Sequence, residues 1–172
     1  MSVNKNLLDF INRSPTPFHA VKNMRTELVK HGFKELRESE SEKLEPSGQY
    51  FVVRNNSSLV AFRVSDKGSM VGVRMVGAHT DSPCLKLKPN AVVEHDGYVQ
   101  LGVEPYGGVL MNPWFDRDLS LAGRVTLMST DKILFSRLID FETPIAFIPS
   151  LAIHLDREAN SGRKVNPQTM LP

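Results

Sequence analysis

The chain has 172 residues, of which 41% are hydrophobic and 23% are charged. These fractions are typical of a soluble globular protein and argue against disorder, and the length allows one domain or parts of two. The 21 basic and 19 acidic residues leave a formal net charge of +2. Because no basic block stands out, nucleic acid is not expected as a partner.

The start of the chain and its single cysteine indicate the cellular compartment in which the protein is expected. Residues 1–5 lack the apolar core of a signal peptide, and no apolar run is long enough to span a membrane. Cys84 excludes an internal disulfide, which agrees with a reducing compartment. We therefore expect a cytoplasmic protein without a membrane partner, in which Cys84 serves mainly as a small apolar residue.

Two amphipathic helices are predicted near the start of the chain. The first covers about residues 4–12 and carries its apolar residues on one face. Thr16 caps the second helix, a proline follows at its first position, and Gly32 supplies the left-handed residue that ends it. His19 and His31 belong to this helix, so they are better explained as helix residues than as ligands.

Short strands are predicted after the helices. Tyr50–Arg54 and Leu59–Val64 form a hairpin across a turn of Asn and Ser residues. Val71–Val76 is short and rich in β-branched residues, which favours a buried strand. No helix is predicted between about residues 89 and 141, and the tail at 156–172 has the composition of a loop. Further strands are expected at residues 85–88, 92–93, 98–103, 119–128 and 133–139.

The order of these elements predicts an α/β fold class in two parts. Residues 1–88 are expected to form the N-terminal part of an α/β domain. Residues 89–172 are expected to form a β-rich unit that is attached to this domain or inserted into it.

The segment Gly77–Pro83 follows the strand predicted to end at residue 76. Open α/β sheets bind ligands in the crevice beyond such strand ends. His79 can present one ring nitrogen to a metal, while Asp81 accepts a hydrogen bond from the other nitrogen and fixes the tautomer. The same residues also suit a surface loop in which Asp81 and Ser82 satisfy a turn before the proline.

Four segments of the chain, taken in order, match a known pattern. They are Leu8–Ala20, Gly77–Leu85, Pro113–Val125 and Ile148–Leu155. Together they resemble the aspartyl aminopeptidase family of cytoplasmic zinc exopeptidases. The resemblance implies a zinc-exopeptidase-type α/β catalytic domain interrupted by a β-rich domain through which subunits assemble. It also implies a centre with two Zn²⁺ ions, a peptide substrate with an acidic N-terminal residue (Asp or Glu), and a homo-oligomer.

The resemblance assigns roles to three residues. His79 matches a zinc-ligand histidine, and Asp81 matches the carboxylate that orients it. His154 matches a histidine of the inserted domain that reaches the active site of its own or a neighbouring subunit. There it acts either as a metal ligand or as a group that stabilises the tetrahedral intermediate.

Asp116 and Asp118 also belong to the family pattern. Their positions on either side of Arg117 favour a local ion-pair network or a turn over a direct catalytic role.

The chain departs from the family pattern in one respect. Family members carry further acidic and histidine ligands and a Glu-Glu pair whose first member is the general base, whereas this sequence has no Glu-Glu pair. All those positions would lie downstream, so the chain is expected to be the N-terminal portion of a family member and to be inactive alone. The alternative is a non-catalytic assembly or regulatory protein that retains the oligomerisation surface.

Overall fold

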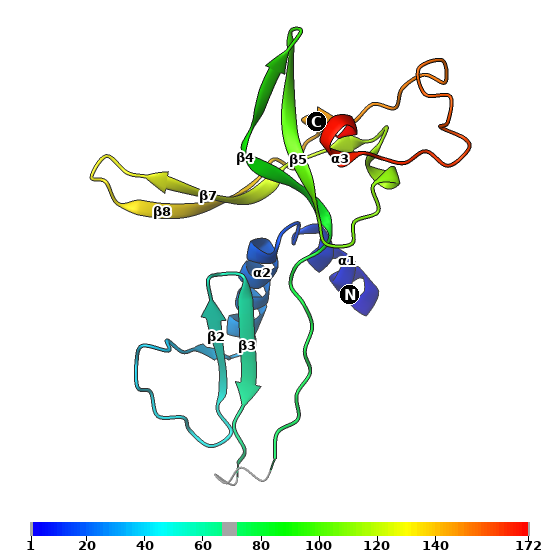
Figure 1. Cartoon of the computed structure of the whole chain (residues 1–172). Helices are drawn as coiled ribbons and strands as arrows, with labels where there is room; N and C mark the ends of the chain where they lie inside the picture. Colours follow the sequence, from blue (N-terminus) through cyan, green and yellow to red (C-terminus); the bar gives the residue numbers. More distant parts are fainter. Residues whose placement is uncertain (1, 67–71, 172) are drawn as a thin grey trace. The chain divides into compact units, whose positions relative to one another are not determined.

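A computed structural model describes residues 2–66 and 72–171 (Figure 1). The chain forms two compact units, which are considered separately. The first unit comprises Met1–Asp81 and Ala122–Asp140, and the second comprises Ser82–Leu121 and Phe141–Pro172. The expected division at residue 88 stays a prediction. Within the described residues, no helix is both long enough and apolar enough to cross a membrane.

The structure confirms both predicted helices of the first unit and the predicted cap of the second. α1 (Val3–Asn12) begins after Ser2, whose side chain accepts a hydrogen bond from the backbone of the first turn. α2 (Pro17–Lys30) begins after Thr16, as the sequence predicts. Leu7, Leu8 and Ile11 of α1 are 56%, 59% and 55% exposed, whereas Val21 of α2 is 2% exposed. Within this unit, α2 therefore contributes to the core and α1 does not.

A three-stranded sheet completes the core of the first unit. β1 (Lys34–Glu35) runs parallel to β2 (Gln49–Arg54), which pairs in antiparallel fashion with β3 (Ser58–Arg63). This confirms the predicted hairpin. Its turn uses asparagines at positions 55 and 56 with φ of 50° and 53°, a region that asparagine tolerates better than most residues. Phe51 of β2 is completely buried.

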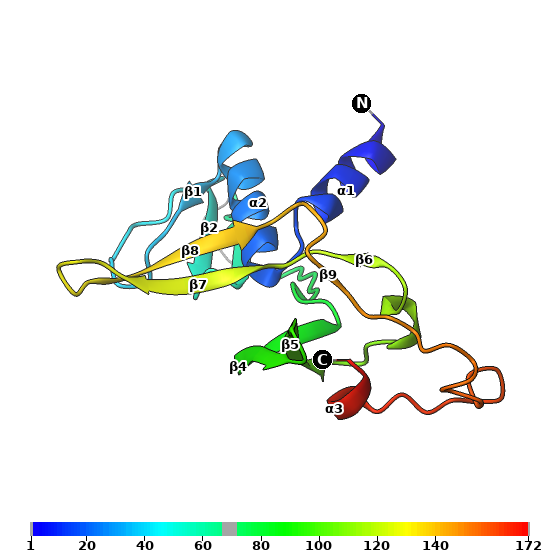
Figure 2. The same cartoon turned by 90° about the horizontal axis from the view of Figure 1, so that it is seen from above.

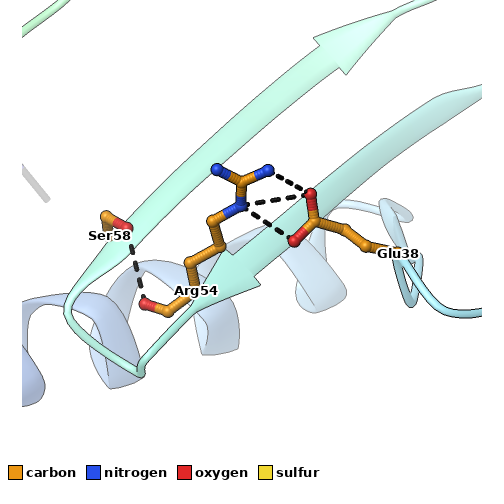
Figure 3. A network of polar contacts seen from close by, with 3 residues as sticks. All are labelled: Glu38, Arg54 and Ser58. Atoms are coloured by element: carbon orange, nitrogen blue, oxygen red, sulfur yellow. Dashed lines mark hydrogen bonds and ion pairs between the residues drawn. The ribbon is translucent and has the colours of Figure 1, made fainter.

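One end of the hairpin is also held by a charged pair, shown in Figure 3. Arg54 donates from Nε to Glu38 at 2.8 and 3.1 Å and from Nη2 at 2.5 Å. These hydrogen bonds lower the pKa of Glu38 and raise that of Arg54. Because both side chains are exposed, solvent screens the pair, and it adds little to stability.

A second hairpin belongs to the same unit although it lies far along the chain. β7 (Ala122–Met128) pairs with β8 (Leu134–Asp140), and Figure 2 shows the two strands passing beside α2. Arg124 of β7 bonds the backbone oxygen of Asn55 at 2.8 Å and its side-chain oxygen at 3.1 Å. The same guanidinium lies 4.0 Å from the centre of the Phe18 ring. Arg124 therefore ties this hairpin to α2 and to the β2–β3 turn.

The second unit contains a long hairpin and a small core. β4 (Cys84–His95) pairs with β5 (Tyr98–Tyr106), and its register shifts between residues 87 and 92. The predicted strands at 85–88 and 92–93 are thus parts of one strand. The core of this unit is a cluster of buried Val103, Ile148 and Leu171, with partly buried apolar residues packed against it.

Short elements surround this core. A single 3-10 turn, η1 (Asn112–Trp114), is the only helical structure between residues 89 and 141, all of which are described. β6 (Asp118–Leu119) pairs with β9 (Ala146–Phe147), so the strand expected at 119–128 is divided between β6 and β7. The tail is not entirely loop, because α3 (Pro167–Met170) forms after the capping residue Asn166.

The predicted strand Val71–Val76 is wrong over the part that can be assessed. Val71 lies outside the described residues, and residues 72–76 form no strand. Val73, Met75 and Val76 are 69%, 86% and 99% exposed. An apolar run becomes a buried strand only when neighbouring strands pair with it, and none of the described strands does. The apolar composition of this run therefore predicted a burial that the chain alone does not provide.

His19 is the buried polar residue among the described side chains, at 8% exposed, and its Nδ1 lies 2.7 Å from the Thr16 hydroxyl. Burial lowers the pKa of His19, and the negative charge of Asp140 partly opposes this shift. At a pH between the lowered pKa of the folded chain and the unfolded value near 6.5, the unfolded chain binds more protons than the folded chain. The contribution of His19 is therefore complete above the unfolded pKa and declines as the pH falls below it.

We predict that the free energy of unfolding of His19→Gln falls less as the pH is lowered than that of the wild-type chain, because glutamine does not titrate. Chemical denaturation followed by circular dichroism from pH 7.5 down to pH 5 measures it, with His31→Gln as the control at an exposed histidine. A wild-type chain whose stability rises as the pH falls over this range would contradict the prediction.

We also predict that Arg124→Lys destabilises the first unit by about 1–2 kcal/mol, because lysine keeps the charge but loses the planar contact with both partners. Chemical denaturation of this variant is compared with Arg137→Lys. Arg137 lies on β8, 5.6 Å from the centre of the Phe135 ring on its own strand. Equal losses in the two variants would show that Arg124 has no special role in holding the hairpin.

Candidate functional site

The segment that carries His79 is extended and exposed. Residues 72–79 have no regular secondary structure. The Thr80 hydroxyl donates a hydrogen bond to the backbone oxygen of Ser57 at 2.7 Å, in the turn between β2 and β3. Because Thr80 immediately follows His79, this bond holds the histidine's backbone close to the hairpin while its side chain stays in solvent.

His79 and Asp81 lie together in the first unit. Nδ1 of His79 is 2.7 Å from the backbone oxygen of Asp81 and 3.4 Å from its carboxylate oxygen. A backbone carbonyl can only accept, so Nδ1 carries the proton in the neutral ring. Nε2 then presents its lone pair outward, and no hydrogen bond within the described chain involves it. This is the tautomer that a histidine ligand needs when it binds a metal through Nε2.

These residues fit one ligand of a zinc site and not a complete site. Structural and catalytic zinc ions use roughly three or four protein ligands. Across residues 2–66 and 72–171, no three side chains of His, Cys, Asp or Glu gather closely enough to hold a metal. Among the described residues, the structure therefore shows one exposed imidazole in contact with Asp81 and no complete metal site.

His154 belongs to the second unit and is exposed. It lies in a turn in which the backbone oxygen of Ala152 accepts hydrogen bonds from the N–H groups of Leu155 at 2.8 Å and Asp156 at 3.2 Å. The structure thus brings His79 and Asp81 together, while His154 is presented by a separate unit. An exposed imidazole on a turn is able to bind a metal or to donate a hydrogen bond to a substrate.

Asp116 occupies a turn, which is one of the two roles expected for it. Its φ of 55° is in the left-handed region. Its N–H donates to the backbone oxygen of Ile148 at 2.9 Å, and its Oδ1 accepts from the N–H of Ser150 at 2.8 Å. Hydrogen bonding from Ser150 holds the pKa of Asp116 below its usual range.

Arg163 is a residue that the sequence did not single out. It forms an ion pair with Asp156 at 3.0 Å, and its guanidinium lies 4.6 Å from the centre of the Phe115 ring. The side chains of Arg163 and Asp156 are only 17% and 14% exposed. No local pattern marks Arg163, because it lies in a polar tail and its aromatic partner is far away along the chain.

Comparison with known proteins places the chain in a family. The family described as Aminopeptidase I zinc metalloprotease (M18) matches residues 10–172. The "Probable M18 family aminopeptidase 2" of Pseudomonas fluorescens is 53% identical over 172 residues, which cover 99% of this chain and 40% of that protein. The chain therefore spans about 40% of the length of the curated relatives that it matches.

Solved structures agree with this match. In the Ape4 and Nbr1 complex, a chain 44% identical has a TM-score of 0.87, with 96% of this chain and 32% of that chain covered. In the mApe1 dodecamer of S. cerevisiae, a chain 33% identical has a TM-score of 0.78, with coverages of 89% and 36%. These neighbours confirm the predicted α/β fold class, and the match over residues 10–172 confirms the family resemblance. The chain belongs to the M18 family of aminopeptidase I zinc metalloproteases.

Proposed function

We propose that the chain is the N-terminal portion of a zinc-dependent aminopeptidase that removes acidic residues, Asp or Glu, from the N-termini of peptides. The observation that carries this proposal is the arrangement of His79, whose Nδ1 contacts Asp81 while Nε2 faces outward. The family match over residues 10–172 supports a zinc-dependent protease. The preference for acidic residues rests on the resemblance to aspartyl aminopeptidases.

Each residue has a defined part in this proposal. His79 contributes Nε2 as a zinc ligand, because its Nδ1–H donates to the backbone oxygen of Asp81. The Asp81 carboxylate, 3.4 Å from Nδ1, adds to the orientation of the ring. His154 either binds metal or donates a hydrogen bond to the negative oxygen that develops on the substrate carbonyl. When bound, zinc polarises the scissile carbonyl and lowers the pKa of a coordinated water. A complete site is proposed to hold two zinc ions.

The 172-residue chain alone is proposed to have no appreciable aminopeptidase activity. A single imidazole with a supporting aspartate binds zinc weakly, because the remaining ligands and the Glu-Glu base of the family are not in this sequence. In family members those residues lie in the portion of the protein that the chain does not span.

A chimera tests the function directly. This chain replaces the matching N-terminal 40% of the Pseudomonas fluorescens relative, and the product is assayed with Asp-, Glu- and Leu-linked chromogenic amides. We predict cleavage of the acidic substrates and a loss of about 100-fold or more with His79→Gln. Asp81→Asn should cost less, about 10-fold, because it removes the carboxylate charge 3.4 Å from Nδ1 but keeps the backbone acceptor. Zinc content is measured in parallel, and it should fall with His79→Gln.

The matched control is His31→Gln, since His31 is an exposed histidine beside a carboxylate, that of Glu27, at the end of α2. Preference for the Leu-linked amide would reject the acidic substrate class. Full activity in His79→Gln would reject the ligand assignment. The unfused chain, assayed with added zinc, serves as the inactive reference.

The alternative function, a non-catalytic assembly or regulatory protein, is favoured by one observation. The β4–β5 hairpin exposes apolar side chains near its tip, including Val92 at 66%, Tyr98 at 74% and Val99 at 69%. Exposed apolar surface of this kind is typical of an interface. We propose that a second copy of the chain covers it, in line with the dodecamer formed by a solved M18 relative.

We predict that Val92→Ser combined with Val99→Ser lowers the mass of the assembly formed by the chimera. The register pairs Val92 with Leu101 and Val99 with Glu94, so both valines lie on one face of the hairpin. Sedimentation velocity measures the mass, and Val3→Ser is the control at an 82% exposed valine of α1. If the double variant retains the full assembly mass, as the control should, the β4–β5 hairpin is not an interface.

A further inference from the structure

The segment that carries His154 is held at both ends by two adjacent residues, Phe115 and Asp116. The first contact lies before the histidine, where Asp116 bonds residues 148 and 150. The second lies after it, where Arg163 bridges Asp156 and the Phe115 ring. All of these residues belong to the second unit.

The contact through Asp116 combines two hydrogen bonds with an unusual backbone conformation. Its N–H continues the β6–β9 pairing by one more bond, to the oxygen of Ile148. Its carboxylate then accepts the N–H of Ser150 at 2.8 Å, and hydrogen bonds to an ionised acceptor are among the stronger ones. Both bonds need the left-handed backbone of Asp116, with φ of 55°, a conformation that residues other than glycine seldom adopt.

The contact through Arg163 closes the other end of the segment. The guanidinium of Arg163 lies between the carboxylate of Asp156 at 3.0 Å and the face of the Phe115 ring at 4.6 Å. Because the two charged side chains are mostly buried, water screens their attraction less than it would at the surface. Losing one partner would leave the other charge poorly solvated.

Between these contacts the chain makes one tight turn. Ala152 accepts two backbone hydrogen bonds, from Leu155 and Asp156, and His154 lies within this turn with its side chain exposed. The chain on both sides of His154 therefore makes tertiary contacts, while its imidazole remains exposed. This arrangement suits a residue that must be presented at a defined place.

We infer that Asp116 is a positioning residue for His154, and that its carboxylate, with the Arg163–Phe115 contact, sets where the His154 turn is presented. Asp116 acts through the backbone of residues 148–150 and does not itself contact substrate or metal. The inference rests on the proposed function in one respect, the role of His154 in binding metal or substrate. The coupling between Asp116 and the turn is a property of the chain itself.

Amide relaxation and exchange in the ¹⁵N-labelled 172-residue chain test the coupling. We predict that Asp116→Ala lowers the order parameters of residues 151–155 from about 0.85 to below about 0.6. The Ser150 amide should exchange with solvent about 10-fold faster or more. Asp116→Asn retains an acceptor oxygen at the same position, so it should recover most of the order. This rescue distinguishes positioning through the acceptor from a general need for the side chain.

Asp118→Asn is the matched control, because Asp118 is an exposed carboxylate on the adjacent β6 strand. It should leave residues 151–155 unchanged. Arg163→Met should loosen residues 154–156 without changing the Ser150 amide, which keeps the test informative if Asp116→Ala unfolds the second unit. Amides of α2 and β2 report whether the first unit stays folded.

Two results would overturn the inference. One is an unchanged order of residues 151–155 in Asp116→Ala. The other is a loss of order in Asp116→Asn as large as the loss in Asp116→Ala. Neither readout needs zinc or enzymatic activity, so a chimera that proves inactive on acidic substrates would reject the proposed function and leave this result standing.

Discussion

The contact of Arg124 with two distant parts of the chain determines how the first unit is assembled. Its guanidinium reaches the Asn55 carbonyl at the β2–β3 turn and the Phe18 ring of α2. A planar cation can donate in its plane and stack through its face at the same time, which a lysine ammonium cannot do. The β7–β8 hairpin is therefore joined to a helix and a sheet that precede it by many residues. Among the described strands, pairing connects β7 to β8 alone.

The parts of the fold that could be predicted are those that depend on neighbouring residues. Thr16 caps α2, and the asparagines at 55 and 56 make the β2–β3 turn, because capping and left-handed backbone are properties of single residues and their neighbours. The prediction of a strand at 71–76 was wrong for the opposite reason. Its apolar composition requires partners from elsewhere in the chain, and the described strands pair with one another instead.

In the candidate site, too, contacts between neighbouring residues could be predicted and contacts between distant residues could not. The spacing of His79 and Asp81 predicted that the two residues would interact, since a separation of two residues leaves little freedom in an extended chain. It did not predict that the backbone oxygen of Asp81 would lie closer to Nδ1 than the carboxylate does. The contacts around His154 were beyond sequence reasoning, because Asp116 and Ser150 are 34 residues apart and nothing local in either segment indicates the other.

Hydrogen bonds between side chains and the backbone, and not burial, hold the residues of the candidate site. Thr80 ties the His79 segment to Ser57, and Asp116 ties the His154 segment to Ser150, while both histidines remain exposed. An exposed imidazole loses little solvation free energy when it is neutral, so its orientation can be set in advance at small cost. Its electrostatic effect on a substrate is weak for the same reason, because water screens it. Strong catalysis by these residues therefore requires surfaces that exclude water around them.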